Sequence, residues 1–357
     1  MDITFLVGNG FDIAAGIKTS YRDFYNWYCN QPSASPCIEH FKREIQDDVK
    51  KGGENWSDFE IGLGKYTSRF DQETVEEFIE CYEDAHEKIV QYIEEEHQRF
   101  EFVATREEIA QLSKGILLFY QELSPQEQAT IKSIIKKEQS ESTQVHFISF
   151  NYTNLLQKCI NFVSKEPLRQ WQYNGYSHQN KVDASIIHIH GISNKYPILG
   201  VSDASQIANH ELLSVPHFRD IMLKSESVNA IGEFWYQNSE NLIKCSRIIC
   251  ILGMSLGDSD SIWWTTIMSW LKENADRHLI VFWHTPKTLS SRSIYQRQRE
   301  ISKVKEKLAD YTDFSKDELK SLNMRIHVVL NTEKVLKVNL KVKEASTKKV
   351  LVNTEPT

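Results

Sequence analysis

The stretch that decides the fold is Ile3-Thr4-Phe5-Leu6-Val7-Gly8-Asn9-Gly10-Phe11-Asp12, at the N-terminus. Its first five residues are apolar or β-branched, which predicts a strand buried on both faces, as in a parallel sheet. Gly8-Asn9-Gly10 then allows a tight turn and lets a ligand approach the backbone, because glycine has no Cβ. A helix is expected next, with the N–H groups of its first turn facing an anion.

A nucleotide pyrophosphate is held at this first β–α turn in a doubly wound sheet. The third glycine of the usual dinucleotide fingerprint is missing here, and a plain tight turn produces the same pattern. Further motifs in the sequence are therefore needed to distinguish a nucleotide site from a simple turn.

Composition limits the class of protein. The chain has 357 residues, of which 40% are hydrophobic and 25% charged, as in an ordinary globular protein larger than one typical domain. Its net charge of -7 argues against general nucleic-acid binding, which needs a basic face. We see no apolar run long enough to span a membrane and no signal peptide, so we expect a cytoplasmic protein that does not bind membranes. The six cysteines form no Cys-x-x-Cys pair, so we expect reduced thiols.

Strand-like apolar runs recur along the chain with helical material between them. After the first strand they lie at residues 145–150, 185–189, 247–252, 279–283 and 326–330. We therefore expect an α/β, Rossmann-like, mostly parallel sheet over residues 1–330, with a large helical insertion at about 55–140. In residues 331–357, Val338, Leu340 and Val342 alternate with polar residues and Lys348 to Val352 follow, which predicts a lysine-rich edge strand or a loose tail.

Four of the predicted strands are followed directly by unusual polar residues. These segments are Gly8-Asn9-Gly10-Phe11-Asp12, Phe150-Asn151-Tyr152-Thr153-Asn154, His188-Ile189-His190-Gly191 and Gly253-Met254-Ser255-Leu256-Gly257-Asp258-Ser259-Asp260. Each alone is explained by turn chemistry. Because ligands bind outside the carboxyl ends of parallel strands, we expect all four to meet at one edge of the sheet.

As an ordered set, these motifs resemble the AbiH family of bacterial phage abortive-infection proteins, from the N-terminus to about residue 285. Gly16-Ile17 and Trp56-Ser57-Asp58-Phe59-Glu60 complete the resemblance. The set is also similar to a divergent sirtuin-type NAD-binding fold, in which Gly-Ala-Gly-x-Ser would correspond to the segment at Gly8, and the catalytic His-Gly to His190-Gly191.

The resemblance to sirtuins has two departures. Phe150 and Thr153 replace the glutamine and aspartate that flank the sirtuin asparagine, and the zinc-binding cysteine pairs are absent. We therefore do not expect protein deacylation. What remains resembles the sirtuin-like NAD hydrolases of phage defence, with NAD as the substrate and no metal. The NAD contacts that this implies are Gly8, Asn9, Gly10, Phe11, Thr153, Gly253 and Ser255.

Three side chains are suited to the implied hydrolysis. Cleavage of the nicotinamide–ribose bond passes through an oxocarbenium-like state, and the cationic nicotinamide needs no acid to leave. Asn151 can hold a ribose hydroxyl or the attacking water. His190 is a base suited to neutral pH, and Asp12 can bind a ribose hydroxyl or help to position water. Partners implied are NAD or a related nucleotide, a phage trigger or partner protein, and further copies of the chain.

Two other functions stay open. The same residues would also suit a sensor that binds NAD or an ADP-ribose-type nucleotide without turnover. A metal-dependent nuclease would use acidic residues such as Asp12, Glu60, Asp258 and Asp260. The ordinary interpretations of single residues are that Ser57 or Asp58 caps a helix and Trp56 packs in a core, and that Asp258 and Asp260 cap the helix near Ser261. His188, Trp263 and Trp264 are interpreted as structural. His210 and His217 have no third ligand in spacing, so we assign no metal.

Overall fold

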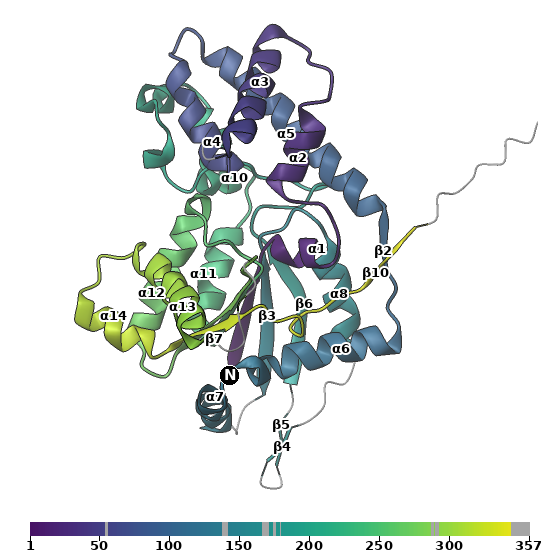
Figure 1. Ribbon diagram of the computed structural model, residues 1–357, viewed down its shortest axis with the longest axis vertical. Coiled ribbons are helices and arrows are strands. Elements are labelled where there is room, and N and C mark those ends of the chain that lie inside the picture. The colour runs from purple at the N-terminus through teal and green to yellow at the C-terminus, as the bar shows by residue number, and fades with distance from the viewer. Residues whose placement is uncertain are drawn as a thin grey trace, which may run out of the picture.

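The sheet confirms the predicted fold class. A computed structural model describes residues 1–53, 56–137, 142–165, 171–173, 176–178, 180–286, 289 and 293–343. Within them, one six-stranded sheet has all its strands parallel (Figure 1). Its strands are β1 (Asp2–Val7), β3 (Thr143–Ser149), β6 (Asn180–His188), β7 (Ser246–Leu252), β8 (His278–Trp283) and β9 (Ile326–Leu330).

The order of the strands is that of a Rossmann-like sheet. Across the sheet the strands run β6-β3-β1-β7-β8-β9. Counted along the chain this is the order 3-2-1-4-5-6, which reverses direction between β1 and β7. A ligand site is expected outside the carboxyl ends of the strands at this reversal, because the connections there lead to opposite faces of the sheet.

Each face of the sheet buries its own hydrophobic cluster. Ile3, Phe5 and Val7 point to one face and Leu6 to the other, because side chains alternate along a strand. The first face is covered by α1 (Gly10–Ala14), α6 (Arg106–Leu117), α7 (Pro125–Lys137) and α8 (Leu155–Val163). The second is covered by α11 (Trp235–Cys245), α12 (Ser261–Glu273), α13 (Ile294–Ala309) and α14 (Lys316–Asn323).

A separate helical layer, at the top of Figure 1, stands over the carboxyl edge of the sheet. It has its own aromatic core and consists of α2 (Tyr21–Tyr28), α3 (Pro36–Lys51), α4 (Phe59–Tyr66), α5 (Val75–Gln98) and residues 199–223, which include α9 (Phe218–Met222). We call it the helical cap. The stretch 55–140 divides between two places, since α4 and α5 belong to the cap whereas α6 and α7 pack on the sheet.

Local sequence explains where the helices begin. Ser35 accepts a hydrogen bond from the Ile38 amide ahead of Pro36, the first residue of α3. Ser124 and Pro125 begin α7 as predicted, and the Glu127 amide donates to the Ser124 hydroxyl. Along α5, buried residues at three- and four-residue steps face the cap core.

The remaining elements are short. They are α10 (Lys224–Ala230), the 3-10 helices η1 (Thr67–Arg69), η2 (Phe119–Glu122), η3 (Ala204–Gln206), η4 (His210–Ser214) and η5 (Asp258–Asp260), and the strands β2 (Phe100–Phe102), β4 (Trp171–Tyr173), β5 (Tyr176–His178) and β10 (Leu340–Val342). The predicted C-terminal strand is β10, which pairs antiparallel with β2; Lys348 to Val352 lie outside the described residues. Of the helices in the described ranges, none is long and apolar enough to cross a membrane.

Candidate functional site

The predicted strand-end segments meet in one cavity. It lies between the carboxyl edge of the sheet and the helical cap and has a volume of about 570 Å³, within the range of small-molecule sites. The candidate residues that line it are Gly8, Asn9, Gly10, Asp12, Asn151, Thr153, His190, Gly253 and Ser255. The predicted convergence of the four segments on one edge is therefore confirmed.

Phe11 differs from the other candidate residues. Its side chain is 3% exposed and packs in the hydrophobic cluster under α1 and α8, away from the cavity lining. The cavity also contains residues from the cap, among them Tyr21, Arg22 and Glu60. The sequence motif around Trp56 to Glu60 thus borders the cavity from the side opposite the sheet.

The glycines of the first loop also bring this loop into contact with the loop after β7. A Cβ on Gly10 would lie 2.7 Å from the Gly253 Cα, so these glycines let two loops touch. The Gly10 amide donates to the Gly253 carbonyl and the Phe11 amide to the Gly8 carbonyl, over 2.8 and 3.0 Å. Two amides of the first turn of α1, those of Gly10 and Phe11, are therefore already bonded to backbone carbonyls and do not face an anion. Helix α1 is also only five residues long.

Asp12, Asn151 and Thr153 form a buried polar group at the cavity wall. The Thr153 hydroxyl donates to Asp12 Oδ2 over 2.8 Å. Burial raises the pKa of Asp12 to about 7, while the nearby Thr153 hydroxyl and Asn151 amide act in the opposite direction. Within the described part of the chain, Asp12 Oδ1 and both amide atoms of Asn151 have no hydrogen-bond partner. Such atoms are rare in folded proteins, and here they line a cavity.

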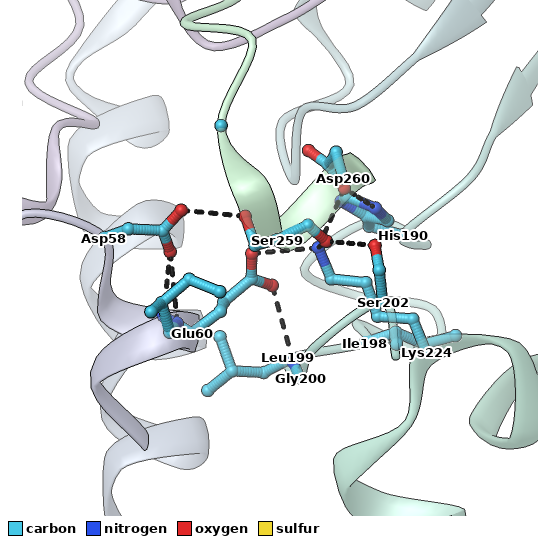
Figure 2. A network of polar contacts seen from close by, with 12 residues as sticks. Asp58, Glu60, His190, Ile198, Leu199, Gly200, Ser202, Lys224, Ser259 and Asp260 are labelled. Carbon is cyan, nitrogen blue, oxygen red and sulfur yellow. Dashed lines mark hydrogen bonds and ion pairs between the residues drawn. The ribbon is translucent and has the colours of Figure 1, made fainter. Parts of the chain in front are cut away.

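His190 joins the cavity to a network of buried charges (Figure 2). Its Nε2 lies 3.1 Å from Asp260 Oδ1, and the Lys224 Nζ lies 2.9 Å from that same oxygen. Burial and the Lys224 charge lower the pKa of His190, and the Asp260 carboxylate acts against them. The imidazole is consequently neutral at pH 7, as a general base requires.

Lys224, at the start of α10, occupies the centre of this network (Figure 2). Its side chain is fully buried, and its ammonium donates to Glu60 Oε2 at 2.9 Å, Asp260 Oδ1 at 2.9 Å and the Ser259 carbonyl at 3.0 Å. Three acceptors satisfy all three N–H bonds. Burial raises the pKa of Glu60 to about 7, and although burial also disfavours ionised Asp260, Lys224 and His190 hold the pKa of Asp260 below its usual value.

The sequence did not reveal Lys224 as a member of the site. It follows the apolar run Ile221-Met222-Leu223 and has no motif around it. The predicted capping role of Asp260 is wrong, because its side chain makes no cap hydrogen bond to α12 and is bound by Lys224 instead. Asp58 does cap α4, accepting from the Glu60 and Ile61 amides, and Trp263 and Trp264 are buried in the core as expected.

The acidic residues considered for a nuclease are otherwise engaged. Glu60 and Asp260 share Lys224, and Asp258 accepts from the Tyr311 hydroxyl at 2.6 Å. In the described ranges, no group of three or more His, Cys, Asp or Glu side chains is arranged to hold a metal ion.

Fold and cavity together define a Rossmann-like α/β protein with a cavity at the reversal of its strand order. Residues 4–283 match the family described as bacteriophage abortive infection AbiH. The chain therefore belongs to the AbiH family, which indicates a role in phage defence by abortive infection. No curated protein matches the sequence.

Proposed function

We propose that this protein hydrolyses NAD in the cavity and releases nicotinamide, and that this reaction causes the abortive infection. The observation that carries the proposal is the buried Asn151 amide, which lines the cavity with both its polar atoms unpartnered in the described part of the chain, beside the Asp12 carboxyl group. An amide of this kind is available to a ribose hydroxyl and to a water molecule at the same time.

The proposed reaction needs only water and NAD. Water adds to C1′ of the nicotinamide ribose as the bond to the nicotinamide nitrogen breaks, and the electron pair of that bond leaves with nicotinamide. The products are nicotinamide, ADP-ribose and one proton. His190 takes the proton from the water, Asn151 orients the water or ribose, and Asp12 accepts from a ribose hydroxyl. A neutral, buried imidazole suits this task.

Charge on the cap side supports a ligand with phosphates. Arg22 lines the cavity and is exposed, and no ion pair with it occurs among the described residues. A guanidinium binds phosphate oxygens in a forked geometry. Because the Gly8, Gly10 and Phe11 amides are bonded to carbonyls, we assign the pyrophosphate to Arg22 rather than to the helix α1 N-terminus.

The test is nicotinamide release by the purified full-length protein, with and without phage lysate. His190→Ala should lower the rate at saturating NAD by about 10²–10⁴ and leave NAD binding nearly unchanged. Asn151→Ala should weaken both binding and rate. His188→Ala is the matched control, since His188 comes from the same strand end but does not line the cavity.

Melting temperatures of all variants show whether a loss of rate is a loss of fold. Equal rates in the wild type, His190→Ala and Asn151→Ala would exclude this site as catalytic. Tight NAD binding by the wild type without nicotinamide release, even with lysate present, would favour the alternative function of a nucleotide sensor.

A further inference from the structure

We propose that Asp260 is the positioning residue for His190 and that Lys224 holds Asp260 in place for this task. The inference rests on the proposed function, because it assigns roles to Asp260 and Lys224 through His190, the proposed general base. Neither residue belongs to the polar group of Asp12 and Asn151, and Lys224 does not line the cavity.

The geometry fixes the carboxylate. Asp260 Oδ1 lies 3.1 Å from His190 Nε2 and 2.9 Å from Lys224 Nζ. Lys224 cannot turn away, because its other two N–H bonds are directed to Glu60 and to the Ser259 carbonyl. That carbonyl also accepts from the Ser202 hydroxyl over 2.6 Å, and the Ser259 hydroxyl donates to Asp58 over 2.9 Å (Figure 2). Asp260 is thus contacted by His190 and Lys224, and Lys224 is itself held by Glu60 and the Ser259 carbonyl.

This arrangement selects the tautomer of His190. The contact of 3.1 Å between His190 Nε2 and Asp260 Oδ1 is an ion-pair contact that does not have the geometry of a hydrogen bond. A lone pair on Nε2 would face the negative charge of this carboxylate, so the charge favours the tautomer that carries the proton on Nε2. The lone pair is then on Nδ1, the ring nitrogen that is not in contact with Asp260. Nδ1 is therefore the atom that accepts the proton from water, in the way that an aspartate orients the histidine of a catalytic triad.

The same carboxylate stabilises the imidazolium that forms in the reaction. The groups that face His190 are Asp260, Lys224 behind it, and the rings of Phe150 and Tyr152 at 5.4 and 6.2 Å. The phenol of Tyr152 is engaged with the Ile198 carbonyl. Asp260 is thus the negative charge nearest to the ring among these groups, and the Lys224 charge acts against it.

The first test reads the tautomer in the wild-type protein. Nitrogen NMR of the full chain labelled in histidine, with His190 assigned from His190→Gln, should show a proton on Nε2 and none on Nδ1 at pH 7.5. A proton on Nδ1 would overturn the proposal. The measurement needs no activity and no substrate, so it stands apart from any failure of NAD hydrolysis.

The second test compares two variants whose effects are opposite in sign. Asp260→Asn should lower the pKa of His190 and reduce kcat by about 10²–10⁴, with little change in KM. Lys224→Met combined with Glu60→Gln removes the opposing positive charge and should raise the pKa of His190. A merely structural role of the network would reduce activity without moving the two titrations in opposite directions.

Asp258→Asn is the matched control, because Asp258 lies in the same short helix η5 but contacts Tyr311 instead of His190. It should move neither the His190 titration nor kcat. Unchanged His190 titration in Asp260→Asn, or shifts of the same sign in both variants, would overturn the assignment of Asp260. If the wild type releases no nicotinamide while the titrations move as expected, only the proposed function fails.

Discussion

At the scale of one residue, the buried carboxyl group of Asp12 lowers the stability of the folded protein when it is ionised. It is 1% exposed and its pKa is raised to about 7 by burial. Between about pH 4 and pH 7 the folded protein holds a proton that the unfolded chain releases, so stability falls as pH rises through this window. Ionised Asp12 therefore opposes folding at alkaline pH.

We expect Asp12→Asn to stabilise the protein by about 2–4 kcal/mol at pH 8 and by less, about 1–2 kcal/mol, at pH 5, where only the unfolded chain has released the proton. The isosteric amide keeps an acceptor for the Thr153 hydroxyl but carries no charge. Thermal unfolding at both pH values measures the difference. The exposed Asp310→Asn should not alter it, and a variant destabilised at pH 8 would contradict the argument.

The residues of the cavity that directly follow strands could be predicted from the sequence, but the residues that hold them in place could not. Asp12, Asn151 and His190 could be predicted because a strand end fixes their position along one edge. Lys224 and its bond to Glu60 join residues 164 positions apart across two layers, and no local pattern encodes that contact. Asp260 could be identified from the sequence as an acidic residue near a helix start. Whether it caps that helix or forms an ion pair depends on Lys224, which the sequence does not place beside it.

At the scale of elements, the contact between the loops after β1 and β7 forms the floor of the cavity. Gly253 has φ +69° and its missing Cβ would lie 2.7 Å from the Phe11 amide nitrogen. Gly232 has nearly the same φ, +73°, but open space around it. The two glycines therefore separate the cost of a left-handed backbone from the cost of a clash.

We expect Gly232→Ala to cost about 1–2 kcal/mol, the penalty for a Cβ in a left-handed conformation. Gly253→Ala should cost about 1–3 kcal/mol more, because the loops must move apart. Urea unfolding gives both values. Equal costs would mean that the two loops yield freely, and the cavity floor would then not be rigid.

The elements themselves could be read from the sequence where their periodicity is strong. Runs apolar on both faces predicted the strands of the sheet beyond β1, and Ser124-Pro125 predicted the start of α7. The distribution of the helices could not be predicted, because α5 and α6 are both amphipathic and their patterns do not say which core they cover. The sequence also gives no indication that residues 199–223 pack in the core of the cap.

At the scale of the whole molecule, Lys224 links the cap to the sheet layer. Glu60 comes from the cap helix α4, and Asp260 precedes α12 on the sheet. Lys224→Met leaves two carboxylates buried near each other without a cation and should cost about 3–5 kcal/mol. Glu60→Gln should cost about 1 kcal/mol at pH 7, since a pKa of about 7 means that Glu60 is already partly protonated there.

Chemical unfolding of both single variants and of the double variant measures this asymmetry. The double variant should recover part of the loss seen in Lys224→Met, because it leaves one buried carboxylate instead of two. Additive losses would show that Glu60 and Asp260 do not share the lysine energetically.

The strand order also determines when the cavity can form during translation. β1 is the first strand of this sheet to leave the ribosome, yet Val7 pairs with Leu252, and Gly10 bonds to Gly253. At about 5–20 residues per second, the nascent chain holds its first strand unpaired on that side for about 12–50 s. The floor of the cavity closes only after translation has passed β7, so the nascent chain has no complete cavity until the loop that contains Gly253 has left the ribosome.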